Sequence, residues 1–239
     1  MEMDLAILVD VIKETNKNWR FIFESPLYDD IKFTSGQLVQ LLAKPNSDDS
    51  IKRNYSIASW SNGTNRFELI ITYLEGGKMS EYLFNEAKIG DEFGYKGPMG
   101  VFTLPEDLTQ RDIFMVSTGS GISPFRSMVN YIRKNKIPHK SIKLFFGTRT
   151  FQDLLYRREM YTIQQDLNNF EYVPVLSREN RKGYKSGYVH EHYLKLIDEM
   201  DEKPLVYFCG WDRMISEGRK HLSERGFEMM KDIRVEIFG

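Results

Sequence analysis

The residues best suited to bind a ligand lie between Val116 and Arg126, where Gly119 and Gly121 follow an apolar run. Glycine has no Cβ, so the backbone can approach a ligand closely. The amphipathic run that begins near Pro124 predicts a helix, whose N-terminal N–H groups and dipole attract a phosphate. The spacing is Gly-x-Gly-x-x-Pro, so the turn by itself is more typical of an ordinary strand-to-helix connection.

A second candidate is the strand-like segment from Arg53 to Ser59. Alternation along a strand places Arg53 and Tyr55 on one face, and Asn54 and Ser56 on the other. A guanidinium beside an aromatic ring and a hydroxyl suits a phosphate, a flat ring and a polar contact at the edge of that ring. A surface strand with a cross-strand Arg–Tyr pair has the same pattern.

A third candidate is a glycine pair, Gly76 and Gly77, before Met79 and Ser80 at the start of a predicted helix. Such a helix start offers unpaired N–H groups to a phosphate. An N-capped helix that binds nothing is equally consistent with these residues.

The elements that must position these residues begin with a series of short strands. Apolar or alternating runs predict strands at residues 6–11, 19–24, 37–42, 53–59, 67–74, 91–93 and 101–103. The last two of these strands flank residues 97–100, and residues 80–87 read as the one helix of this region. Many short strands without helical periodicity favour an antiparallel, Greek-key barrel.

After a polar linker at residues 105–111, the pattern of predicted elements changes. Strands are predicted at residues 113–117, 142–147, 171–176, 205–209 and 234–238, alternating with helices at 123–134, 154–167, 189–200 and 212–225. This alternation predicts a five-stranded, parallel, doubly wound α/β unit with right-handed crossovers. We therefore expect two domains, a barrel over residues 1–108 and an α/β domain over residues 109–239.

Composition excludes several function classes. The 33 basic and 34 acidic residues give a net charge of -1, which offers no bulk attraction to nucleic acid or membrane. The single cysteine, Cys209, excludes an internal disulfide and a cysteine-ligated iron–sulfur cluster, and fits a reducing, cytoplasmic setting. Asp10 and Lys13 interrupt the N-terminal apolar run, so we expect neither a signal peptide nor a membrane span. The histidine spacing predicts no metal site.

Taken in order, the candidate segments resemble the ferredoxin–NADP reductase family. The Arg-x-Tyr-Ser strand, the Gly-x-x-Ser helix start, the Gly-Pro-x-Gly of residues 97–100 and the Gly-x-Gly-x-x-Pro-Phe-Arg turn follow the order and spacing of that family. The likeness continues through residues 146–149, 153–156, 175–179, 187–189, 207–210 and 235–238. It covers nearly the whole chain, and the ordered set makes it specific.

The resemblance implies an FAD-binding barrel. Arg53 would hold the FAD pyrophosphate, Tyr55 would lie against the isoalloxazine ring, and Ser56 would hydrogen-bond near flavin N5. Phe238 would cover the other face of the flavin and move aside for nicotinamide. Backbone and hydroxyl contacts to the FAD phosphates are implied for Gly77, Met79 and Ser80.

The same resemblance implies an NAD(P)-binding α/β domain. Thr118, Gly119 and Gly121 would lie along the pyrophosphate and nicotinamide, with Gly210 beside them. Cys209 and Glu236 would flank the hydride path, so the implied catalytic residues are Ser56, Cys209 and Glu236. Glu236 either relays protons or is a strand-end carboxylate, and a packing role suits Cys209 better than a nucleophilic one.

Cationic residues after the second and third strands of this domain bear on the choice of nicotinamide. Arg149 and the Ser177-Arg178 pair, followed by Lys185, suit the 2′-phosphate of NADP. A solvated basic loop has the same composition, so NAD remains possible.

The expected function is electron transfer between NAD(P)H and a one-electron protein carrier such as ferredoxin or flavodoxin, by hydride transfer between nicotinamide C4 and flavin N5. The alternatives are a flavin or ferric reductase, the reductase component of an oxygenase, and a nucleotide-binding subunit without turnover. The acceptor and the oligomeric state are open.

Overall fold

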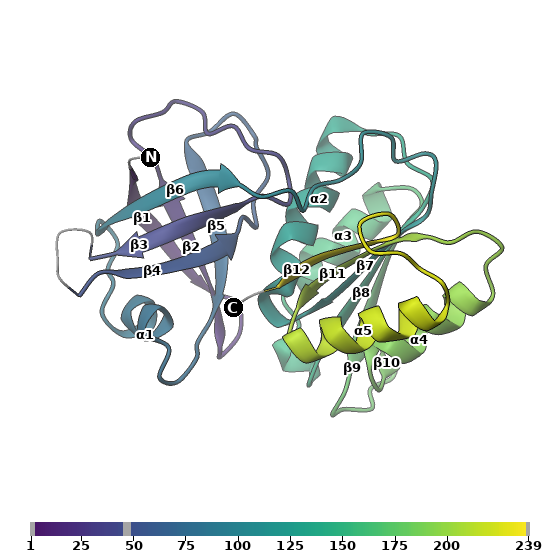
Figure 1. Ribbon diagram of the computed structural model, residues 1–239. Coiled ribbons are helices and arrows are strands. Elements are labelled where there is room, and N and C mark those ends of the chain that lie inside the picture. Colours follow the sequence, from purple (N-terminus) through teal and green to yellow (C-terminus); the bar gives the residue numbers. More distant parts are fainter. Residues whose placement is uncertain (1–2, 45–48, 238–239) are drawn as a thin grey trace.

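The computed structural model describes residues 3–44 and 49–237. The chain forms two units side by side, each built on a six-stranded sheet (Figure 1). The strands of the first unit are β1 (Asp4–Lys13), β2 (Asn18–Glu24), β3 (Leu38–Ala43), β4 (Ile51–Ser56), β5 (Arg66–Thr72) and β6 (Glu92–Met99). Its helix is α1 (Lys78–Asn85).

The first sheet is antiparallel, in the order β4-β3-β6-β1-β2-β5. It curls until its two edge strands meet, because Ile57 forms a bridge with Leu69 and the Ala58 N–H donates to the Glu68 carbonyl at 2.8 Å. Alternating side chains fill the interior, with an aromatic core of Phe21, Phe23, Phe67, Phe93 and Tyr95. The predicted antiparallel barrel is confirmed.

Residues 97–103 differ from the sequence prediction. Strand β6 extends from the predicted residues 91–93 as far as Met99, and residues 101–103 lie outside any strand. The reason is burial of Phe102, whose ring packs against Phe125 and Tyr207 of the second unit, with centroids 5.8 and 5.3 Å away. The apolar residues of this segment therefore pack between the two units instead of forming a strand.

The second sheet is parallel, in the order β10-β9-β8-β7-β11-β12. Its strands are β7 (Ile113–Thr118), β8 (Ile142–Thr148), β9 (Phe170–Leu176), β10 (Lys185–Ser186), β11 (Leu205–Gly210) and β12 (Ile233–Ile237). Five of them match the prediction. The sixth, β10, is a two-residue edge strand, too short for an apolar pattern to reveal.

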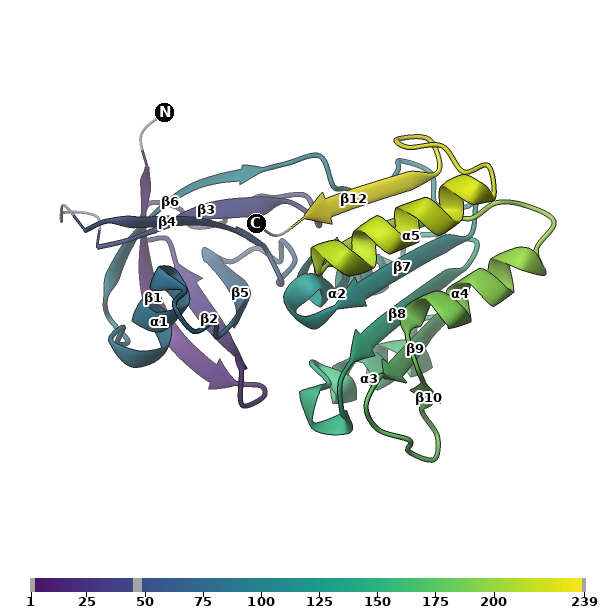
Figure 2. The same ribbon diagram turned by 60° about the horizontal axis from the view of Figure 1, so that its bottom comes forward.

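Helices cover both faces of this sheet (Figure 2). They are α2 (Ile122–Asn135), α3 (Arg157–Asp166), α4 (Val189–Asp198) and α5 (Asp212–Glu224). Helices α2 and α3 pack on one face and α4 and α5 on the other, as expected for a doubly wound unit. No helix within residues 3–44 and 49–237 is long and apolar enough to cross a membrane.

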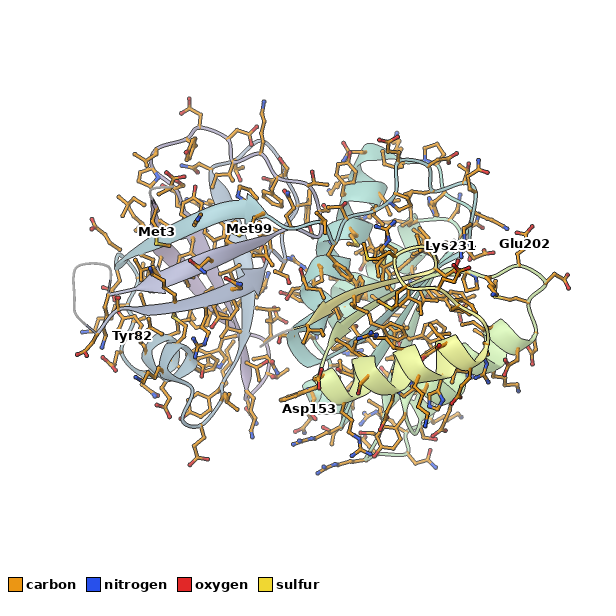
Figure 3. The ribbon with its side chains drawn as sticks, viewed as in Figure 1. Met3, Tyr82, Met99, Asp153, Glu202 and Lys231 are labelled. Carbon is orange, nitrogen blue, oxygen red and sulfur yellow. The ribbon has the colours of Figure 1, made fainter. Side chains whose placement is uncertain are left out.

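The parallel strands point their carboxyl ends at the barrel. Glu202, which precedes β11, lies at the end of the molecule away from the barrel (Figure 3), and the arrow of β12 points toward the barrel (Figure 2). Ala58, Ile70 and Phe102 of the first unit belong to the same buried cluster as the α2 side chains. The predicted boundary at residues 108 and 109 falls between β6 and β7 and stays a prediction.

Candidate active site

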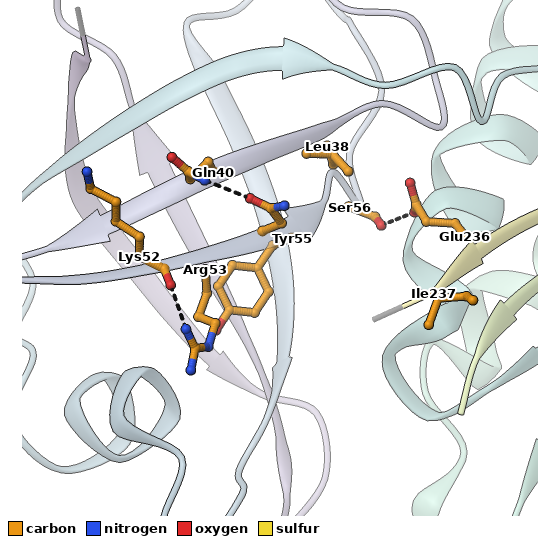
Figure 4. Close-up of a pocket in the computed structure, with 9 residues that line it drawn as sticks. Leu38, Gln40, Lys52, Arg53, Tyr55, Ser56, Glu236 and Ile237 are labelled. Atoms are coloured by element: carbon orange, nitrogen blue, oxygen red, sulfur yellow. Dashed lines mark hydrogen bonds between the residues drawn. The ribbon is translucent and has the colours of Figure 1, made fainter. Parts of the chain in front are cut away.

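The three residues proposed as catalytic meet where strand β4 faces strand β12. Ser56 is the last residue of β4, and its hydroxyl donates to Oε2 of Glu236 on β12 (Figure 4). Cys209 lies beside Glu236 in the register of β11 and β12, and its thiol donates to the same oxygen at 3.9 Å. One carboxylate oxygen thus joins a barrel strand to two strands of the α/β unit.

Burial sets the electrostatics of this group. Removal from water raises the pKa of Glu236 to about 7, although the hydrogen bonds from Ser56 and Cys209 act in the opposite direction. Burial, and next the Glu236 charge, raise the pKa of the Cys209 thiol well above its usual value. Cys209 is therefore a neutral thiol, unsuited to nucleophilic attack. Glu236 titrates near neutral pH, where a carboxyl group can both accept and release a proton.

A cavity of about 480 Å³ opens beside this contact (Figure 4). Arg53 and Tyr55 line it together with Ser56 and Glu236. Burial raises the pKa of the Tyr55 phenol, with Arg53 acting against it, so the ring stays neutral. The exposed Arg53 guanidinium donates to the Lys52 carbonyl at 2.9 Å. An aromatic wall and a cation at the mouth suit a flat ring that carries phosphate.

Other residues that line this cavity, Leu38, Gln40 and Asn54, were not among the predicted site residues. The Gln40 amide donates to Asn54 Oδ1 at 3.2 Å, and these residues face each other in the register of β3 and β4. Leu38 lies opposite Ser56 in the same register. The sequence feature that could have indicated Gln40 is its position in β3, where it is a polar residue within an apolar run.

The N-terminus of α1 presents free backbone N–H groups, although the Glu81 carboxylate in its first turn already accepts from the Gly76 N–H at 2.7 Å. Gly77 is the N-cap and provides no side-chain cap, so the first-turn N–H groups have no intrahelical partner. The Ser80 hydroxyl donates to the Leu74 and Gly77 carbonyls at 3.0 Å, and thereby holds the turn. The Met79 side chain is buried in the barrel core. Phosphate contacts at this turn would therefore come from backbone N–H groups.

The glycine turn after β7 packs directly on the end of β11. A Cβ on Gly121 would lie 2.2 Å from the Cys209 carbonyl oxygen, and one on Gly210 would lie 2.4 Å from Thr118 Oγ1. Gly119 and Gly210 also have φ values of +56° and +140°, which disfavour other residues. The glycines therefore bring the turn, α2 and the Cys209 strand end within van der Waals distance.

Trp211 belongs to this turn, although the sequence analysis gave it no role. Its backbone N–H donates to Thr118 Oγ1 at 3.1 Å, and its side chain is 62% exposed. The Cβ position of Gly119 lies 3.5 Å from the indole nitrogen. The signal in the sequence was an aromatic residue directly after the Cys-Gly pair.

Three predicted cationic residues gather at the carboxyl edge of the sheet. Arg149 follows β8 and Arg178 follows β9, and the Arg178 N–H donates to the Arg149 carbonyl at 2.9 Å. Lys185 on β10 pairs with the end of β9. All three are exposed, and none forms an ion pair within the described part of the chain. The Ser177 hydroxyl donates to the Thr148 carbonyl at 3.1 Å.

Phe238, which was expected to cover the other face of the flavin, lies outside the described residues.

Both units match established domain families. Residues 6–104 match the oxidoreductase FAD-binding domain, and residues 115–220 match the oxidoreductase NAD-binding domain. Ferredoxin–NADP reductase B of Sorangium cellulosum is 36% identical over 191 residues, which are 77% of this chain and 76% of that protein. The anthranilate 1,2-dioxygenase electron transfer component of Acinetobacter baylyi is 31% identical over 82% of this chain, but this chain spans only 55% of it.

A solved structure has the same fold over the full length. The ferredoxin NADP+ reductase of Neisseria gonorrhoeae, with bound FAD and NADP, superposes with a TM-score of 0.84 at 22% identity. The superposition covers 99% of both chains. Together with the ordered motifs and the two domain families, these relatives define the chain: it belongs to the ferredoxin–NADP reductase family of FAD- and NAD(P)-binding oxidoreductases.

Proposed function

We propose that this oxidoreductase passes electrons from NADPH through FAD to a one-electron protein carrier such as ferredoxin or flavodoxin. The observation that supports it is the convergence of Ser56, Cys209 and Glu236 on one oxygen, where the FAD-binding unit meets the NAD-binding unit. When bound, FAD supplies the exchange between two-electron and one-electron chemistry. The domain division at residues 108 and 109 and the cytoplasmic setting stay predictions.

The residues at the junction fit a bound flavin. Arg53 and the α1 N-terminus would offer donors to the FAD pyrophosphate, and Tyr55 would offer a neutral ring on which the isoalloxazine can stack. Ser56 would offer a hydroxyl to the flavin, and Glu236, whose pKa is about 7, could accept or release a proton there. Thr118, Gly119 and Ser120 of the glycine turn are half-buried and offer some surface to the nicotinamide dinucleotide, whereas Gly121 is buried against the end of β11.

The choice of NADP over NAD rests on Arg149, Arg178 and Lys185. Their side chains are exposed at one edge, and no carboxylate among the described residues neutralises them. A 2′-phosphate would pair with such a group, whereas an NAD-selective site tends to place an acidic residue there.

Stopped-flow reduction tests both parts of this proposal. The protein, reconstituted with FAD, is mixed anaerobically with NADPH or with NADH, and flavin absorbance is followed. We expect bleaching by both, with NADPH effective at lower concentration. Arg178→Gln should raise the Kd for NADPH about tenfold and leave that for NADH unchanged. Arg158→Gln, an exposed arginine on α3, is the matched control. Failure to bind FAD would contradict the function, and equal Kd shifts for both nucleotides would contradict NADP selectivity.

A second function is favoured by the dioxygenase electron transfer component among the relatives. The matched region spans 55% of that protein. In this second function the reductase would pass electrons to an iron–sulfur protein of an oxygenase or to a free acceptor. Steady-state assays with ferredoxin, flavodoxin, free flavin and ferric chelates separate these functions. Turnover with free flavin alone would favour the second function.

A further inference from the structure

Arg126 is a buried cation at the junction that the proposed chemistry does not use. It lies on α2 with 4% of its surface exposed. Its Nε donates to both oxygens of Glu159 at 3.0 and 2.9 Å. One terminal nitrogen donates to the Ala58 carbonyl and to Glu68, each at 2.9 Å. The guanidinium also stacks on the Tyr156 ring, 4.4 Å from its centroid.

These partners come from both units. Glu159 and Tyr156 belong with Arg126 to the α/β unit, whereas Ala58 and Glu68 belong to the barrel. Ala58 also donates its N–H to the Glu68 carbonyl at 2.8 Å, in the contact that closes the barrel. One planar group therefore bridges a closed barrel edge and two helices of the other unit.

The residues of this bridge lie close in sequence to the two cofactor-binding segments. Ala58 is two residues beyond Ser56, and Arg126 is five residues beyond Gly121 of the nucleotide turn. Helix α2 begins directly after that turn, so moving Arg126 moves the turn as well. The Arg126 contacts thus fix the position of the turn relative to Ser56.

Because Arg126 is charged and buried, its hydrogen-bond partners must stay in fixed positions around it. Burial acts to lower the pKa of Arg126, but Tyr156, Glu68 and Glu159 outweigh it and raise the pKa, so the guanidinium stays charged. A charged group with so little exposure to solvent must form its hydrogen bonds to acceptors within the protein. The rigid fork of a guanidinium can serve acceptors on both sides at once, whereas an ammonium is a compact point charge.

We propose that Arg126 is a positioning residue that sets the distance between the nicotinamide-binding turn and the flavin-binding strand through its bonds to Ala58 and Glu68. This proposal rests on the proposed reductase function. Hydride transfer requires donor and acceptor atoms about 3–3.5 Å apart, and a displacement near 1 Å can slow such a reaction about 100-fold. The barrel-side bonds therefore control the rate of hydride transfer, and the Glu159 bonds within the α/β unit do not.

The test compares the same Glu→Gln substitution at two partners of Arg126 and adds a third variant at Arg126 itself. Glu68→Gln weakens the bond to the barrel, whereas Glu159→Gln weakens the bond within the α/β unit. Arg126→Lys keeps the charge and removes the fork. For each FAD-loaded protein we would measure flavin content, thermal unfolding, the Kd for NADP+, the charge-transfer absorbance of the reduced flavin with NADP+, and the rate of flavin reduction by NADPH.

We expect Glu68→Gln and Arg126→Lys to weaken the charge-transfer absorbance and slow flavin reduction about tenfold or more, with full flavin content and a Kd within about threefold of the original. Glu159→Gln should keep both signals while lowering the unfolding temperature. Equal slowing by Glu68→Gln and Glu159→Gln, or no slowing by Glu68→Gln, would overturn the positioning role. An unmodified protein that NADPH does not bleach would instead overturn the proposed function, together with the inference built on it.

Discussion

Two of the polar contacts between the units of this protein differ in almost every physical respect. Ser56 and Glu236 share one hydrogen bond beside a cavity of about 480 Å³, and the pKa of Glu236 is raised to about 7. Arg126 is buried, and its guanidinium meets acceptors from both units. The carboxyl group at the first contact can change its charge near neutral pH, whereas the guanidinium at the second stays charged and holds acceptors from both units.

The largest expected effect is on the buried contact. Arg126→Met should lower the free energy of unfolding by about 3–5 kcal/mol, because Glu159 loses its cation and Glu68 keeps only Arg20. Urea denaturation measures this loss. The control is Arg66→Met, which breaks a pair with Glu24 whose arginine is 57% exposed and should cost less than about 1 kcal/mol. Similar losses for both variants would remove the distinction between the contacts.

At the reactive contact, we expect a large effect on rate with little effect on folding. Ser56→Ala removes the donor to Glu236 and the hydroxyl beside the cavity, and should slow flavin reduction by NADPH roughly 10- to 100-fold. Stopped-flow absorbance measures this rate constant. Ser61→Ala, which removes a hydroxyl bonded to the Ile31 carbonyl of the same barrel, should leave the rate unchanged. An unchanged rate in Ser56→Ala would exclude the serine from the reaction.

The raised pKa of Glu236 should make stability depend on pH. An unfolded carboxyl titrates near 4.5 and the folded one near 7, so between these values the folded protein holds an extra proton. The stabilisation is present in full below pH 4.5 and is lost as the pH rises through 7. We expect a loss on the order of 1–3 kcal/mol, measured by urea denaturation from pH 4.5 to 8.

The matched variant for this pH dependence is Glu236→Gln. It keeps the shape of the side chain and cannot titrate, so its unfolding free energy should lack the decline between pH 4.5 and 7 that the unmodified protein shows. A decline of the same size in both proteins would assign the pH dependence to another group.

The smallest expected effect belongs to Cys209. Its thiol is a weak donor, 3.9 Å from Glu236, and such a hydrogen bond is worth less than about 1 kcal/mol. Cys209→Ala should therefore slow flavin reduction only a few-fold, less than Ser56→Ala does. A loss as large as that of Ser56→Ala would show that the thiol shares the role of the hydroxyl.

Local patterns predicted the elements well where propensity and burial agree. The β–α alternation after residue 112 and the glycine turn at Gly119 and Gly121 are both present in the structure. The pattern was wrong at residues 101–103, because Phe102 is apolar for a contact between units. It also missed β10, whose two residues pair only because the β9 edge is already in place.

The sequence by itself determined the family, the two cofactor-binding units and the candidate residues, because these depend on the order and spacing of motifs. Only the tertiary structure brought Ser56 to Glu236, which is 180 residues away in the chain, and raised the pKa of that carboxyl by burial. It also turned Arg126, one residue of a motif, into the bridge between units. Desolvation and long-range contacts arise from packing, and no local pattern in the chain encodes them.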